Sequence, residues 1–133
     1  MEKLDFKTAD KAFYTGKPGR FDLLTLPALP YLMIDGQGDP NATPAYTAAV
    51  GALYALSYGL KFHAKAALSR DHVVGPLEGL WWADDMADFT TGRRDGWRWT
   101  MMIRQPDWIT PAMLDQVRAA KSDGSPAFAA VRL

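Results

Sequence analysis

The stretch NATPAYTAAVGALYALSYGLKFHAKAAL, residues 41–68, predicts one long helix, and this helix decides what fold the rest of the chain can form. Thr43 is a suitable N-cap, and Pro44 follows it at the first helical position, where proline is well tolerated. From Val50 to Lys61, residues suited to one packed face recur at helical spacing. Such a face must pack against another layer, so we expect the flanking segments to supply a sheet.

Two glycines and two tyrosines in this helix need an explanation. Gly51 and Gly59 each cost about 1 kcal/mol relative to alanine in a helix interior. We expect both glycines to allow close packing of the helix against the sheet. Tyr54 and Tyr58 are four residues apart, so their rings should lie along one side of the helix.

The segments on either side of the helix have strand character. Residues 21–36 predict two short extended pieces, separated by the prolines of LPALP, which cannot donate to a sheet ladder. Residues 72–82, HVVGPLEGLWW, predict one strand, and residues 97–106, WRWTMMIRQP, predict another. Alternation along the second strand places four of its side chains on one face: Trp97, Trp99, Met101 and Ile103.

The remaining segments complete a two-layer architecture. Residues 109–121 predict a short helix capped by Thr110, and residues 127–133, AFAAVRL, predict a last strand. Residues 1–20 should form a loosely ordered lead-in, and residues 21–133 should form one domain. The order of elements predicts an α+β fold, a two-layer sandwich in which one long and one short helix cover a mostly antiparallel sheet.

The composition excludes several classes of protein. The 133 residues contain no cysteine, which excludes disulfides, thiolate catalysis and cysteine-ligated zinc. Fifteen basic residues balance fifteen acidic ones, unlike the basic surface of a nucleic-acid binder. The charged start of the sequence does not resemble a signal peptide, and no apolar run is long enough to span a bilayer. We therefore expect a cytoplasmic protein that binds neither nucleic acid nor membranes.

One acidic residue stands alone in an aromatic strand. Alternation places Glu78 on the same face as Leu80 and Trp82, whereas Trp81 points to the other face. Glu78 either faces solvent or pairs with an arginine of the neighbouring strand, or it lies in a ligand site. In apolar surroundings its pKa would be raised. It would then attract a cationic or hydrogen-bond-donating group, orient a water molecule as general base, or protonate a carbonyl oxygen.

Four motifs occur in an order and at a spacing that resemble one known family. They are LPALPYLMIDGQGDPN at 26–41, ALYALSYGLKF at 52–62, PLEGLWW at 76–82 and WTMMIRQPDWIT at 99–110. Together they are similar to the GyrI-like small-molecule-binding domain family, and in particular to its stand-alone bacterial members. The resemblance covers residues 23–133.

The resemblance implies a fold of strand-helix-strand-strand modules. In complete family members two such modules, related by pseudo-twofold symmetry, meet around a ligand groove lined by the helix-free sheet face. Some members are effector-binding domains that take up drug-like molecules. Some stand-alone members hydrolyse the cyclopropane ring of DNA-alkylating natural products, and another relative inhibits DNA gyrase.

The resemblance places Glu78 toward the groove, as ligand contact and catalytic residue, and this placement outweighs the solvent-exposed alternative. An aromatic neighbour and a tyrosine edge should accompany it. The expected ligand-binding residues are Tyr54, Tyr58, Glu78, Trp81, Trp82, Trp99 and Met101.

The family continues into a second module with a His-x-Gly-Pro-Tyr motif, which this sequence does not contain. We therefore expect a homodimer to rebuild the groove, with each copy supplying one Glu78. The first functional hypothesis is small-molecule binding, followed by cyclopropane hydrolysis and then by a protein-interaction role of the gyrase-inhibitor type. We expect no cofactor. A metal site is not expected either, because His63 and His72 lack acidic partners at ligand spacing.

Overall fold

The computed structural model describes residues 3–16, 18–19, 24, 26–87, 91–121 and 126–133. Its larger elements are a three-stranded sheet, the long helix predicted from residues 41–68 and the shorter helix predicted from residues 109–121. Several short elements accompany them. In chain order the elements are β1 (Lys3–Leu4), α1 (Phe6–Ala9), η1 (Lys11–Phe13), β2 (Tyr31–Gln37), α2 (Pro44–Leu68), β3 (Asp71–His72), β4 (Leu77–Ala83), η2 (Arg94–Gly96), β5 (Trp97–Arg104), α4 (Pro111–Lys121) and α5 (Pro126–Ala130).

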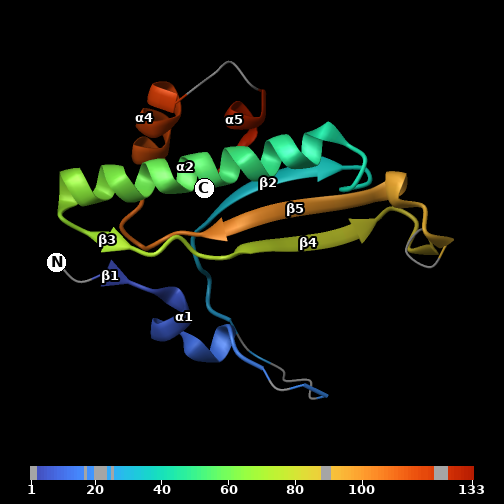
Figure 1. Ribbon diagram of the computed structural model, residues 1–133, viewed down its shortest axis with the longest axis horizontal. Helices are drawn as coiled ribbons and strands as arrows, with labels where there is room; N and C mark the ends of the chain where they lie inside the picture. Colours follow the sequence, from blue (N-terminus) through green and yellow to red (C-terminus); the bar gives the residue numbers. More distant parts are fainter. Residues whose placement is uncertain (1–2, 17, 20–23, 25, 88–90, 122–125) are drawn as a thin grey trace.

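The sheet confirms the predicted α+β class. Its strand order is β2-β5-β4, and both pairings are antiparallel. Helix α2 lies along one face of the sheet, with α4 and α5 on the same side, whereas β1 and α1 lie on the opposite side (Figure 1). A second, parallel pair joins β1 to β3. The molecule is therefore built of two main layers, with an additional N-terminal segment below the sheet.

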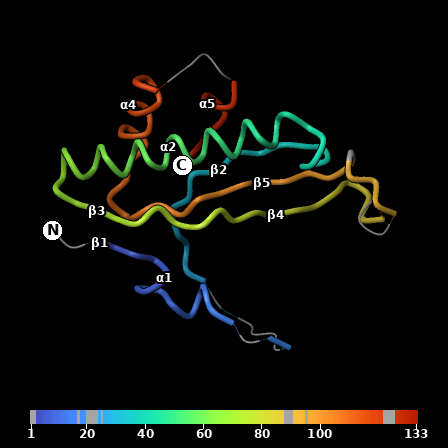
Figure 2. Tube along the Cα trace, viewed as in Figure 1, coloured from blue at the N-terminus to red at the C-terminus, as the bar shows by residue number. Residues whose placement is uncertain are grey.

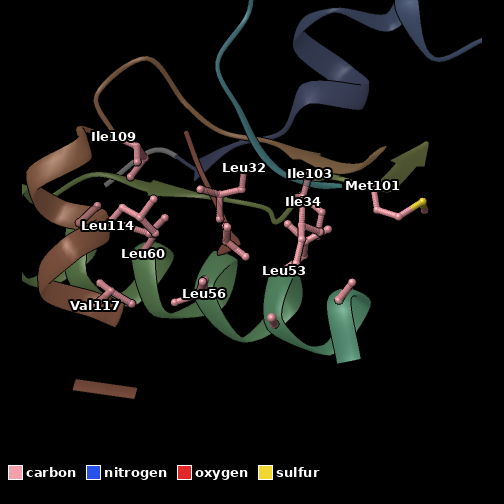
Figure 3. Packing of buried hydrophobic residues seen from close by; sticks show 14 of the residues in the cluster. Leu32, Ile34, Leu53, Leu56, Leu60, Met101, Ile103, Ile109, Leu114 and Val117 are labelled. Carbon is pink, nitrogen blue, oxygen red and sulfur yellow. The ribbon is translucent and has the colours of Figure 1, made fainter. Parts of the chain in front are cut away.

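The core lies between α2 and the sheet. Leu53, Leu56 and Leu60 of α2 are completely buried and point toward the inward residues of β2 and β5, among them Leu32 and Ile103 (Figure 3). Burying one such side chain contributes roughly 1.5–3 kcal/mol. This packing fixes which face of each strand is covered, because successive side chains of a strand point to opposite faces.

A close contact between a glycine and a tryptophan joins β2 to β5. Gly36 stands directly opposite Trp99 in the sheet, and the Trp99 side chain is 1% exposed. A β-carbon on Gly36 would lie 2.1 Å from the Cη2 atom of Trp99, so the indole ring occupies the space of the missing side chain. The large Trp99 ring fits into the layer that faces α2 because Gly36 has no side chain.

Helix α2 also packs against α4 through a glycine. A β-carbon on Gly59 would lie 2.5 Å from Cγ1 of Val117, a buried residue of α4. Nothing lies within 4 Å of the corresponding position on Gly51. The expectation that both glycines permit packing against the sheet was therefore wrong, because Gly59 faces another helix and Gly51 faces open space.

Some predicted boundaries were also wrong. The N-terminal lead-in contains β1, α1 and η1, because Phe6 is buried and anchors it to the rest of the molecule. The strand expected over residues 72–82 is split, since Gly75 and Pro76 separate β3 from β4.

The ends of two further segments differ from the sequence-based expectation. The last predicted strand is mostly the helix α5, and only Arg132 makes a bridge, to Met33 of β2. Part of the extended piece predicted at the start of residues 21–36 lies outside the described residues. None of the described helices is both long and apolar enough to cross a membrane.

The two glycines of α2 give opposite predictions for the same substitution. Gly51→Ala should raise the free energy of unfolding by about 1 kcal/mol, because it improves helix propensity without meeting another atom. Gly59→Ala should lower it by roughly 1–3 kcal/mol, because the new methyl group overlaps Val117. Urea denaturation followed by circular dichroism measures both values. Equal gains in the two variants would show that α2 and α4 do not pack as described.

Candidate functional site

The cross-strand register separates the sheet residues into two sets. One set faces α2. The other points to the side without α2, which we call the open face. The open face is formed by Tyr31, Met33, Asp35 and Gln37 of β2, Glu78, Leu80 and Trp82 of β4, and Arg98, Thr100, Met102 and Arg104 of β5.

Glu78 is paired with a tyrosine across the central strand. The Tyr31 hydroxyl donates a hydrogen bond to the Glu78 carboxylate. Burial is the main cause that raises the pKa of Tyr31 to about 12, and the negative charge of Glu78 and this hydrogen bond act in the same direction. Burial raises the pKa of Glu78, against the opposing effects of the Tyr31 hydrogen bond and the Arg104 charge. The second carboxylate oxygen, Oε2, is buried and has no hydrogen-bond partner among the described residues. The hydrogen-bonding capacity of this buried oxygen is therefore unused within the described residues.

Arg104 fastens the N-terminal segment to the open face beside Glu78. Its guanidinium lies 2.7 Å from Oδ2 of Asp10 and 4.3 Å from the ring centroid of Phe6. It also donates a 3.4 Å hydrogen bond to the Tyr14 hydroxyl. Figure 2 shows this N-terminal segment on the side of the sheet opposite α2. Because Asp10 neutralises Arg104, the arginine is only a secondary influence on the pKa of Glu78.

Beyond Glu78 the open face becomes an apolar platform. Leu80 is 54% exposed and Trp82 is 38% exposed, and Met102 lies half-buried opposite Glu78. At one end Arg98 pairs with Asp84 at 2.7 Å. An exposed apolar surface therefore lies beside one incompletely satisfied carboxyl group.

The residues predicted for ligand contact do not all lie together. Glu78 and Trp82 are on the open face as expected. Trp81 faces the α2 side, where its ring centroid lies 6.0 Å from that of Tyr46. Trp99 and Met101 are 1% and 4% exposed in the core, so neither is available to a ligand at Glu78.

The two tyrosines of α2 are also separated from Glu78 by the sheet. Tyr54 and Tyr58 line a different cleft of about 420 Å³, together with Phe6 and the segment 73–76. The tyrosine that accompanies Glu78 is Tyr31, so the expectation of Tyr54 or Tyr58 in this position was wrong. The reason is that α2 packs on the opposite face of the sheet.

The sequence analysis missed Tyr31 and Tyr14 as parts of the site. Tyr31 begins a recognisable strand, but only the register of β2 against β5 places it opposite Arg104 and within reach of Glu78. An arginine of the neighbouring strand, Arg98 or Arg104, was an alternative partner for Glu78, but Arg104 makes its ion pair with Asp10 and Arg98 makes its ion pair with Asp84. No local pattern links residues this far apart in the sequence.

A larger cleft than the one at Tyr54 and Tyr58 lies at the N-terminal end of the described residues. It has a volume of about 820 Å³ and is lined by residues of β1, α1 and the end of α2, including Lys3, Asp5, Arg70 and Trp108. Its charges are mixed, and the Arg70 guanidinium covers the Trp108 ring at 5.2 Å. We therefore place the candidate site at Glu78, where an unpaired buried acceptor is present.

The two histidines lie on different elements, His63 on α2 and His72 on β3. His72 is buried between the rings of Phe6 and Trp108, and burial, with a smaller effect of Lys61, lowers its pKa to about 4. His63 lies half-buried on α2. In the described part of the chain, no group of three or more histidine, cysteine, aspartate or glutamate side chains is arranged to hold a metal ion.

Comparisons with known proteins found similar crystal structures. No protein-family model matches the chain, and no curated protein matches it closely. At 36% identity over 98% of this chain, it is similar to an uncharacterized conserved protein from Listeria innocua (TM-score 0.83) and to a hydrolase encoded by lin2189 from Listeria innocua (TM-score 0.82). A further structure of a hydrolase from Listeria innocua has the same identity and a TM-score of 0.78. The chain spans 65%, 65% and 66% of these three proteins.

The raised pKa of Glu78 gives a stability prediction with a definite sign. The folded protein holds this proton more tightly than the unfolded chain, so stability is lost as pH rises from the unfolded pKa near 4.5 through the folded pKa. Glu78→Gln removes this loss, so its melting temperature should exceed that of the wild type at pH 7. The difference should shrink toward pH 4.

Thermal denaturation at both pH values measures this effect. Asp107→Asn, at an exposed carboxylate, is the matched control and should show no such gain. A Glu78→Gln protein that is less stable than the wild type at pH 7 would contradict the burial of this carboxyl group.

Proposed function

We propose that this chain is a GyrI-like domain that binds small apolar molecules on its open face, with Glu78 as the polar contact. The observation that carries the proposal is the buried Glu78 Oε2 atom, which has no partner among the described residues, beside an exposed apolar surface. Leaving a buried acceptor unsatisfied costs about 1–3 kcal/mol, so a ligand donor at this position would recover a substantial free energy.

The same surroundings define the chemistry of the ligand. Leu80, Trp82 and Met102 offer an apolar surface that suits a flat ring system. Glu78 favours a ligand that carries a hydrogen-bond donor or a positive charge near one edge, since ionisation of this carboxyl group becomes easier beside a cation. The expected ligand is therefore a planar, apolar molecule with one cationic or donor group.

A second candidate function, hydrolysis, is supported by the comparisons. Two of the similar proteins from Listeria innocua are described as hydrolases. Burial raises the pKa of Glu78 above its usual range, which favours a carboxyl group that can both give and take a proton. For this chain the candidate reaction is the opening of a cyclopropane ring conjugated to a carbonyl group.

In that reaction Glu78, in its protonated form, donates its proton to the carbonyl oxygen of the substrate. Water adds to a ring carbon while the ring C–C bond breaks, and the electron pair of that bond forms an enol. The proton lost by the added water returns to the Glu78 carboxylate, and the enol becomes the ketone. Tyr31 remains protonated because its pKa is about 12, and it holds the carboxyl group in place.

A thermal-shift experiment tests the binding proposal. Planar aromatic cations such as acridine dyes, at about 100 times their Kd, should raise the melting temperature by several degrees. Glu78→Gln should weaken binding of the cations at least about tenfold, which corresponds to 1.4 kcal/mol, but should affect uncharged analogues much less.

Two neighbouring tryptophans on opposite faces of β4 test which face of the sheet binds the ligand. Trp82→Ala should weaken binding, because Trp82 is on the open face, whereas Trp81→Ala removes a ring from the α2 side and should leave ligand affinity unchanged in the folded protein. Equal losses in both variants, or full binding by Trp82→Ala, would refute the assignment of the site.

Mass detection of a ring-opened, water-added product tests the hydrolase candidate separately. Incubation with a cyclopropane-containing alkylator should give product with the wild type and at least about 100-fold less with Glu78→Gln, the usual range for loss of an acid–base group. Ligand binding without product would retain the binding proposal and exclude hydrolysis of that substrate.

A further inference from the structure

Strand β4 leaves one row of backbone groups without partners among the described residues. The C=O of Trp97 and the N–H of Gln105 both bond toward the β2 side, so the odd-numbered residues of β5 direct their backbone groups to β2. The even-numbered residues of β5 therefore bond to Glu78, Leu80 and Trp82 of β4. The N–H and C=O groups of the alternating residues, including Gly79 and Trp81, point outward from the sheet edge.

This edge lacks most of the features that usually prevent strands from pairing with other chains, and Glu78 is its one charged residue. Between Leu77 and Ala83 there is no lysine, no proline and no bulge, since every residue has one partner in β5. Three large apolar side chains on this strand are exposed: Leu80 by 54%, Trp81 by 39% and Trp82 by 38%. A seven-residue apolar edge of this kind is suited to pairing with a further strand.

The strand sequence is complementary to itself. An antiparallel pair of β4 strands centred on Leu80 would use all seven residues of each copy. In this register the outward groups of Gly79 face those of Trp81 of the partner subunit, and Leu80 meets Leu80 of the partner subunit. Shifting the twofold axis to Trp81 would place Glu78 opposite the acidic Asp84 of the partner subunit, which disfavours that register.

The centred register also completes the candidate site. Glu78 would stand opposite Trp82 of the partner subunit, at a position where side chains are closest, with Cα atoms about 4.5 Å apart. Both side chains lie on the open face, because directly opposite residues share one face of a sheet.

From these features we infer that two copies of this chain pair through their β4 edges into one continuous six-stranded sheet. Trp82 of the partner subunit forms a wall of each Glu78 site, and α2 of each copy lies on the opposite side. Only the role of Trp82 of the partner subunit in ligand binding rests on the proposed function. The pairing itself depends on the edge geometry alone.

Mass measurement tests the pairing in the absence of ligand. Light scattering at about 100 µM, well above the Kd of a typical specific interface, should give twice the chain mass of 14.7 kDa. Leu80→Lys places two ammonium groups at the twofold axis and should reduce the mass to that of one chain. Phe62→Lys, at a 58% exposed position on α2, is the matched control and should leave the mass unchanged.

A crosslinking experiment fixes the register. The chain contains no cysteine, so Leu80→Cys introduces a single thiol. Opposite residues at this kind of position are within the Cα spacing that a disulfide requires. Mild oxidation should link Leu80→Cys at least about tenfold faster than Phe62→Cys, because pairing raises the effective thiol concentration.

Each outcome decides the inference. A wild-type monomer, or a dimer that survives Leu80→Lys and does not crosslink through Leu80→Cys, would overturn it. Ligand binding by a monomer would overturn the pairing but leave the proposed function standing. A dimer that crosslinks at position 80 but binds no ligand would support the pairing and refute the proposed function.

Discussion

The packing of the α2 leucines against β2 and β5 is the contact on which the rest of the structure depends. One helix covers one face of a three-stranded sheet, so the strand residues that fill the core come from the alternate positions that face α2. Leu32, Ile103 and Trp99 follow this rule, and the last fits because Gly36 leaves space for its ring. The residues of opposite phase, including Glu78, are consequently placed on the open face. The position of the candidate site is thus a direct result of how the core is filled.

Electrostatics then determines the character of that site. Arg104 is buried but already bound to Asp10 and Tyr14, so it holds the N-terminal segment more than it stabilises the Glu78 anion. Glu78 is left with one hydrogen bond, from Tyr31, and with one unsatisfied oxygen. A carboxyl group in this state favours a ligand that donates a hydrogen bond, and burial raises its pKa. The similarity to proteins described as hydrolases is consistent with either use.

The sequence predicted the α+β class, the long helix and the two faces of β5, because these follow from local periodicity. It predicted the face of Glu78 for the same reason. It did not predict which tyrosine would reach Glu78, since Tyr54 and Tyr58 fit the pattern of an exposed helix side as well as that of a site. It also misassigned residues 127–133, where the short apolar stretch forms α5 and a single bridge to Met33. Short apolar segments fit a helix and a strand equally well.

The amino-acid sequence alone determined that α2 would form, that Trp99 and Met101 would share one face, and that Glu78 would share the opposite phase with Trp82. These are consequences of the 3.6- and 2-residue periods of the backbone. The tertiary structure decided that Tyr31 would be the partner of Glu78, that Arg104 would bind Asp10, and that β4 would lie at the sheet edge. The physical reason is that register and strand order depend on how distant segments pack together. No local sequence pattern contains that information.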